Sequence, residues 1–134
     1  MKILVAYDGS EQASLALERA AEIARLEHAE VTVISVTPVL SSGRVGGVDP
    51  TSDIGEHRRE LEEAVARLRQ LDISATALPA VGDAAEAIIR AAEEQGTNLI
   101  VIGSRGLAGV QRFLMGSVST RVAQHAPCNV YIAR

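Results

Sequence analysis

Residues 99–120, LIVIGSRGLAGVQRFLMGSVST, contain the transition from strand to helix that decides the fold. The apolar run Leu99–Ile102 predicts a buried strand, and the glycine-rich stretch Gly103–Thr120 leads from it into a helical pattern. Glycines at such a junction let backbone N–H groups point into one concavity, where the helix N-terminus adds a partial positive charge. Serine and threonine hydroxyls on the first helical turn add hydrogen-bonding groups. The stretch is therefore predicted to bind an anion such as a phosphate.

Strand and helix patterns alternate over the rest of the chain. Runs such as Lys2–Tyr7 are continuously apolar, which is typical of parallel strands covered on both faces. The alternation favours right-handed crossovers and a single α/β domain, doubly wound, with helices on both faces of a parallel sheet. Strands are predicted at residues 2–7, 31–36, 73–78, 98–102 and 129–133, and helical spacing is present at 13–24, 56–71, 83–96 and 118–126.

Two stretches lead to more specific expectations. Pro79 is predicted to end the strand at 73–78, whose mixed polarity indicates a position at the sheet edge. Residues 40–54 are rich in Ser, Gly, Asp and Pro and have no periodicity, so a long loop is predicted there. Such a loop is either a lid over a site or a connection that varies at little thermodynamic cost.

Composition and charge exclude several classes of function. The 134 residues are 47% hydrophobic and 22% charged, as in a globular domain, and no run approaches the roughly 20 apolar residues of a membrane span. A net charge of −4 and an aromatic content of 2% argue against nucleic-acid binding. The single cysteine, Cys128, is expected to pack as a small apolar residue. Together with the lack of a signal-peptide pattern, it favours a cytoplasmic protein.

The position of a ligand follows from the expected sheet. In open parallel sheets, ligands bind outside the carboxyl ends of the strands, where the strand order reverses. The first strand ends at Asp8 and the fourth at Gly103, so Asp8 faces the glycine stretch if these strands are neighbours. The sequence leaves two roles for Asp8 open: its carboxylate accepts bonds from ribose hydroxyls, or it only caps the following helix.

The glycine spacing is specific. Gly103, Gly106, Gly116 and Ser117 match the pattern Gly-x2-Gly-x9-Gly-[Ser/Thr], whereas GxxxxGK[ST] and GxGxxG are both missing. The glycines are expected to allow close approach of a ligand or a positive φ. This pattern resembles the nucleotide-binding signature of the universal stress protein family. Further segments that resemble this family are Val5–Ser10, Val81–Asp83 and Pro127–Ile132, so the resemblance spans the whole chain.

The resemblance implies a fold, a ligand and a set of contacts. The fold is of the adenine nucleotide α-hydrolase-like type, with five parallel strands in the order 3-2-1-4-5. The ligand is ATP, with a divalent ion such as Mg²⁺ bridging its phosphates. Asp8 would contact the ribose, and the adenine pocket would be lined by Val36 and Ile102, with Ala6 and Tyr7 nearby. The residues implied to hold the ribose and phosphates are Gly103, Arg105, Gly106, Gly116, Ser117, Val118 and Ser119.

The expected function is binding rather than catalysis. The leading hypothesis is an ATP-binding stress-response regulator whose occupancy alters the loops around residues 38–54 and 104–116 and changes the binding of an unidentified protein partner. The alternatives are a slow ATP hydrolase or phosphotransferase and an interaction module without nucleotide. No base, cation and metal set for phosphoryl transfer can be assembled from the sequence. The scattered histidines, His28, His57 and His125, are assigned structural or surface roles.

Assembly is the last expectation. The resemblance implies a homodimer formed through the last strand. The apolar run Val130–Ala133 would lie at the sheet edge, where an exposed strand invites pairing with another chain. Antiparallel pairing about a two-fold axis would cover it.

Overall fold

The computed structural model describes residues 1–39, 50–105 and 116–134, with the side chains of 50–54 left out. Strands and helices alternate along this part of the chain. The elements are β1 (Lys2–Ala6), α1 (Glu11–Glu27), β2 (Glu30–Thr37), α2 (Pro50–Gln70), β3 (Ala75–Val81), α3 (Ala84–Gln95), β4 (Leu99–Gly103), α4 (Ser117–His125) and β5 (Asn129–Ala133).

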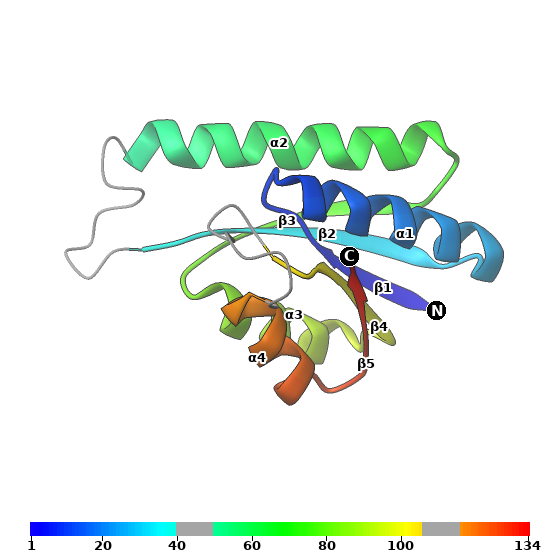
Figure 1. Ribbon diagram of the computed structural model, residues 1–134. Helices are drawn as coiled ribbons and strands as arrows, with labels where there is room; N and C mark the ends of the chain where they lie inside the picture. Colours follow the sequence, from blue (N-terminus) through cyan, green and yellow to red (C-terminus); the bar gives the residue numbers. More distant parts are fainter. Residues whose placement is uncertain (40–49, 106–115) are drawn as a thin grey trace.

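The strands form one parallel sheet in the order β3-β2-β1-β4-β5. β1 lies at its centre, paired with β2 on one side and β4 on the other. α1 and α2 cover one face of the sheet, and α3 and α4 cover the other (Figure 1). The predicted doubly wound α/β fold and the strand order 3-2-1-4-5 are confirmed.

The core has one apolar layer on each face of the sheet. Side chains of a strand alternate between faces, so Ile3 and Val5 pack in the layer beneath α1 and α2 while Leu4 packs in the layer beneath α3 and α4. All three side chains are 1% exposed or less. Burial on both faces explains why the central strands read as continuous apolar runs.

Helix caps set the positions at which the chain enters the helices. Ser10 is the N-cap of α1, and its hydroxyl accepts a hydrogen bond from the Ala13 N–H at 3.1 Å. Asp83 caps α3 in the same way, accepting from the Glu86 N–H at 3.0 Å. α3 ends at Gly96, which adopts the left-handed conformation expected of a glycine at this position.

Two predicted boundaries are wrong. Pro79 does not end its strand but lies inside β3, opposite Ser35 of β2. Because β3 is an edge strand, as predicted, a proline is tolerated there without losing a bond to a neighbour. α2 begins at Pro50 rather than at residue 56, since proline suits the first helical position and polar residues occur in helix starts as well as in loops. Residues 40–49 of the predicted loop lie outside the described residues.

The end of β4 lies directly against the first turn of α1. A Cβ atom on Gly103 would come within 2.8 Å of the backbone carbon and oxygen of Gln12 and of its Cβ. Only a residue without a side chain fits this contact. The close neighbour that requires a glycine at this position is therefore the protein's own helix, and Gly103 does not have the positive φ that was the alternative expectation.

This contact makes Gly103 a sensitive position for stability. We expect Gly103→Ala to lower the free energy of unfolding by about 1–3 kcal/mol, because α1 must move away from the sheet. Gly55→Ala is the control, since a Cβ on this residue of α2 would meet no atom within 4 Å and alanine favours a helix by up to about 1 kcal/mol. Urea unfolding of both variants checks the difference. Equal urea midpoints for wild type and Gly103→Ala would contradict this prediction, because they would show that α1 can move without lowering the free energy of unfolding.

Candidate functional site

A cavity of about 530 Å³ opens at the carboxyl ends of the central strands. It lies where the strand order reverses, because β1 is flanked by the next strand in sequence on one side and by β4 on the other. All four helices contribute to its wall or rim. The lining residues are Ala6, Tyr7, Asp8, Ser10, Ala13, Ile34, Val36, Pro38, His57, Gly82, Ala84, Ile88, Ile102, Gly103, Arg105, Gly116, Ser117, Val118 and Ser119.

The structure brings the predicted site residues together around this cavity. Every residue assigned to the ligand in the sequence lines it, with the exception of Gly106, which lies outside the described residues. These residues come from the ends of three strands and from the start of α4. Two of them, Asp8 and Gly116, are more than 100 positions apart in the sequence. The parallel pairing of β1 with β4 is what makes them neighbours.

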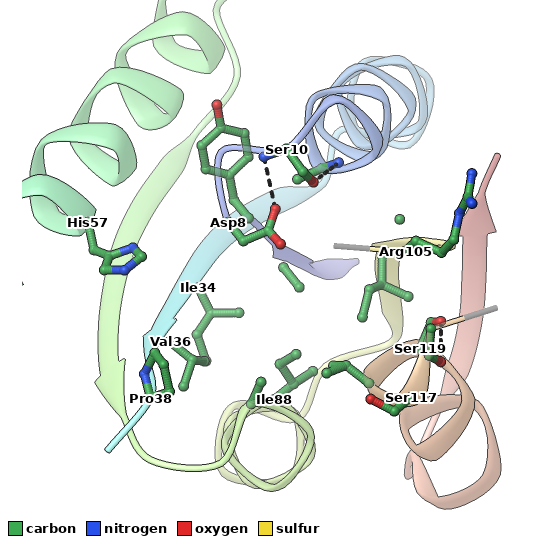
Figure 2. A pocket seen from close by; sticks show the side chains of 18 of the residues that line it. Asp8, Ser10, Ile34, Val36, Pro38, His57, Ile88, Arg105, Ser117 and Ser119 are labelled. Carbon is green, nitrogen blue, oxygen red and sulfur yellow. Dashed lines mark hydrogen bonds between the residues drawn. The ribbon is translucent and has the colours of Figure 1, made fainter. Parts of the chain in front are cut away.

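One side of the cavity is apolar. Ile34 and Val36 come from β2, Ile88 from α3 and Ile102 from β4 (Figure 2). The layer beneath α3 and α4 holds all four side chains in place. An apolar wall of this kind suits a flat, weakly polar group such as a purine ring.

Asp8 lies two residues after the end of β1, and its carboxylate is on the cavity wall (Figure 2). Its Oδ1 accepts a hydrogen bond from the Ser10 N–H at 2.9 Å, which holds the turn between β1 and α1. The N-cap of α1 is Ser10 and not Asp8. The structure therefore gives the role of helix cap to Ser10 and leaves Asp8 as the carboxylate that faces the ligand space.

The opposite side of the cavity is suited to an anion. α4 begins there with Gly116 as its N-cap, and a glycine has no side chain to satisfy the first N–H groups of the helix. The helix N-terminus carries a partial positive charge. Arg105 lies on this side together with Ser117, whose side chain is exposed (Figure 2). Backbone donors and a hydroxyl thus face the same space, with Arg105 at its rim.

The hydroxyl of Ser119 was expected to bond a ligand, but in the structure it bonds the protein's own backbone. The Ser119 side chain is 2% exposed and donates its proton within the protein, with Oγ 2.8 Å from the Ser104 carbonyl oxygen and 3.0 Å from that of Gly116. The Ser104 carbonyl also accepts from the Gly116 N–H at 2.6 Å. These bonds tie the start of α4 to the end of β4. Ser119 therefore holds the backbone on the anion side of the cavity in place. Because its proton is already used, its Oγ can only accept a hydrogen bond from a ligand.

An ion pair joins the two helices on this face. Nη1 of Arg121 in α4 lies 3.1 Å from both carboxylate oxygens of Asp83, the N-cap of α3. The bond from the Glu86 backbone N–H, followed by the Arg121 guanidinium, lowers the pKa of Asp83. Because both side chains are nearly half exposed, the pair contributes little to stability.

His57 is the titratable side chain of the cavity wall that the sequence reasoning missed. It comes from α2 and lines the cavity, although the sequence assigned it a structural or surface role. No local motif marks it, because only the packing of α2 over the sheet brings it to this edge. The other assignments agree with the structure: His28 is the exposed C-cap of α1, His125 ends α4, and Cys128 packs in the apolar layer, where burial raises the pKa of its thiol.

Two features are absent from the part of the chain that the structure describes. Within residues 1–39, 50–105 and 116–134, no three metal-ligating side chains gather into a cluster. In the same part of the chain, no helix combines the length and apolarity that crossing a membrane requires.

Comparison with known proteins agrees with this geometry. The family model described as "Universal stress protein family" matches residues 1–134. Universal stress protein YxiE of Bacillus subtilis (strain 168) is 34% identical, over 99% of this chain and 98% of that protein. A universal stress protein structure from Archaeoglobus fulgidus has a TM-score of 0.83 at 28% identity, covering 100% of this chain and 98% of the other.

A second structure from Archaeoglobus fulgidus, described as a universal stress protein in complex with dAMP, is 31% identical. Its TM-score is 0.79, and the match covers 100% of this chain and 98% of that one. The match of the family model over the full sequence and the 34% identity over nearly the whole of both chains establish the relationship. The chain belongs to the universal stress protein family.

Proposed function

We propose that the protein is a cytoplasmic, ATP-binding regulator of the stress response. The observation that carries this proposal is the cavity, which has an apolar side, a side at the N-terminus of α4 that suits an anion, and the Asp8 carboxylate on its wall. A nucleotide has the same three parts in the same order: a base, a ribose and phosphates. The dAMP complex of the 31% identical relative supports an adenine nucleotide as the ligand.

In this proposal each part of ATP meets a matching part of the wall. The adenine packs against Val36 and Ile102, with Ala6 and Tyr7 nearby. Asp8 accepts hydrogen bonds from the ribose hydroxyls, which are neutral donors that a carboxylate binds well. The phosphates lie at the start of α4, where backbone N–H groups and the helix dipole favour negative charge. The residues proposed for the ribose and phosphates are Gly103, Arg105, Gly106, Gly116, Ser117, Val118 and Ser119.

A divalent ion would accompany the phosphates. Mg²⁺ usually retains several waters and is held by one or two carboxylates together with substrate phosphates. The described residues contain no cluster of three ligating side chains, which suits an ion held mainly by the nucleotide itself. When bound, Mg²⁺ would neutralise part of the phosphate charge. The protein's own contribution there is Arg105 and the N-terminus of α4.

Regulation would act through three residues that line the cavity and lie close to residues 40–49 or 106–115 in the sequence. Pro38 precedes residues 40–49, and Arg105 and Gly116 lie on either side of residues 106–115. A nucleotide that touches these three residues acts directly on the ends of both segments. Occupancy shifts the protein between states only if the nucleotide binds one of them more tightly. We propose that this difference changes the binding of a protein partner.

Calorimetry with ATP and Mg²⁺ tests the site. We expect the wild-type chain to bind one nucleotide, and we expect Asp8→Ala to bind about 10- to 100-fold more weakly, because a hydrogen bond to a charged group is lost. Removing the ribose hydroxyls from the ligand, as in 2′,3′-dideoxy-ATP, should weaken binding to the wild type by a similar factor. It should have little further effect on Asp8→Ala, because both changes remove the same contact.

The proposal fails if the intact chain gives no heat with ATP and Mg²⁺, or if Asp8→Ala binds as well as the wild type. Circular dichroism melting of Asp8→Ala is the control for folding, because Asp8 also holds the turn before Ser10.

The edge strand β5 supports a proposal about assembly. We propose a homodimer in which two copies of β5 pair antiparallel, since β5 lies at the sheet edge and Tyr131 is 39% exposed on it.

Light scattering at micromolar concentration checks this assembly. We expect the mass of two chains for the wild type and of one chain for Tyr131→Lys, because the two-fold axis would bring the added charges together. Leu26→Lys is the matched control, since Leu26 is 81% exposed at the end of α1 and should not affect the mass. A single-chain mass for the wild type would contradict the dimer.

A further inference from the structure

His57 is a polar side chain in the cavity wall to which the proposed function assigns no role. It reaches from α2 toward the cavity, beside Val36 and Pro38 and across from Arg105 (Figure 2). This position lies on the apolar side, where the base of a nucleotide would pack. The imidazole is therefore remote from the phosphates and close to the base.

One ring nitrogen of His57 is in an unfavourable environment. Nδ1 is enclosed by the protein and has no hydrogen-bond partner. Burying a donor or acceptor without a partner destabilises a protein, and native structures contain few such groups. Among the described residues, the other buried side-chain atom without a partner is Oγ1 of Thr97, which does not line the cavity. The ligand site is the place where an unpaired Nδ1 has an evident use.

The surroundings of His57 make its chemistry distinctive. Ile34, Val36, Pro38 and Ile88 give this side of the cavity no side-chain polar group. A neutral imidazole has one N–H donor and one acceptor nitrogen. The edge of adenine likewise has an amino donor beside ring nitrogens that accept. The two groups are complementary, and no other side chain that the structure describes on this side matches the edge of a base.

We propose that His57 is a specificity-determining residue whose Nδ1 accepts a hydrogen bond from the exocyclic amine of the adenine base. This inference rests on the proposed nucleotide site. No hydrogen bond holds Nδ1 in its present position, and rotation about χ2 of a histidine is soft, so a half-turn carries Nδ1 from its enclosed edge toward the cavity. The free protein then bears the unpaired nitrogen, and the complex does not. Stability is given up in the free state for selectivity in the bound state.

Three variants separate the hydrogen bond from the shape of the ring. His57→Phe keeps a ring and removes both nitrogens. His57→Asn places an amide near the position of Nδ1, whereas His57→Gln places it near that of Nε2. Each is titrated by calorimetry with ATP and with purine riboside 5′-triphosphate, which lacks the exocyclic amine, both in the presence of Mg²⁺.

We expect wild type to prefer ATP over the analogue by about tenfold, the effect of one hydrogen bond. His57→Phe should lose this preference, His57→Asn should retain more of it than His57→Gln, and the analogue should bind all four proteins alike. Without ligand, His57→Phe should melt a few degrees above wild type, because the unpaired nitrogen is gone.

The outcomes distinguish this inference from the proposed function. If wild type binds ATP and His57→Phe binds it equally well with the same preference, His57 does not read the base, and the nucleotide site stands. An equal loss of affinity for ATP and the analogue would show that the ring only packs, and would also overturn the inference. If wild type binds neither ligand, the proposed function fails and this inference fails with it. Should His57→Phe not fold, the ordering of His57→Asn and His57→Gln decides the question.

Discussion

The contact between Gly103 and the backbone of Gln12 is the constraint on which the carboxyl edge of the sheet depends. α1 follows β1, and its first turn reaches across to the end of the neighbouring strand β4. The approach leaves no room for a side chain at Gly103. It fixes where α1 begins and therefore where the preceding turn, with Asp8 and Ser10, projects into the cavity.

Both layers of the fold contribute to the site. α1 and α2 supply Ala13 and His57 from one face, and α3 and α4 supply Ile88 and the anion side from the other. The Ser104 carbonyl oxygen accepts hydrogen bonds from the Gly116 N–H and the Ser119 hydroxyl, and these bonds hold the start of α4 beside the end of β4. Residues of all four helices line this cavity, so a ligand that filled it would lie against each of them.

Sequence reasoning succeeded where the signal is local or follows from sheet topology. Continuous apolar runs identified the buried strands, and the glycine spacing led to residues that the structure brings around one cavity. It failed where the answer depends on a distant part of the chain. Pro79 is compatible with β3 only because that strand has a neighbour on one side, and the need for glycine at residue 103 comes from α1. His57 reaches the cavity through the packing of α2, which no pattern around it records.

The most direct test of the central claim is to map where ATP binds by nuclear magnetic resonance, using backbone amide signals during titration with ATP and Mg²⁺. The account predicts that the largest changes fall on Asp8, Val36, Gly103 and Ser117, at the carboxyl edge of the sheet. Leu26, at the far end of α1, should stay unchanged. Changes absent throughout, or gathered away from the cavity, would contradict the account.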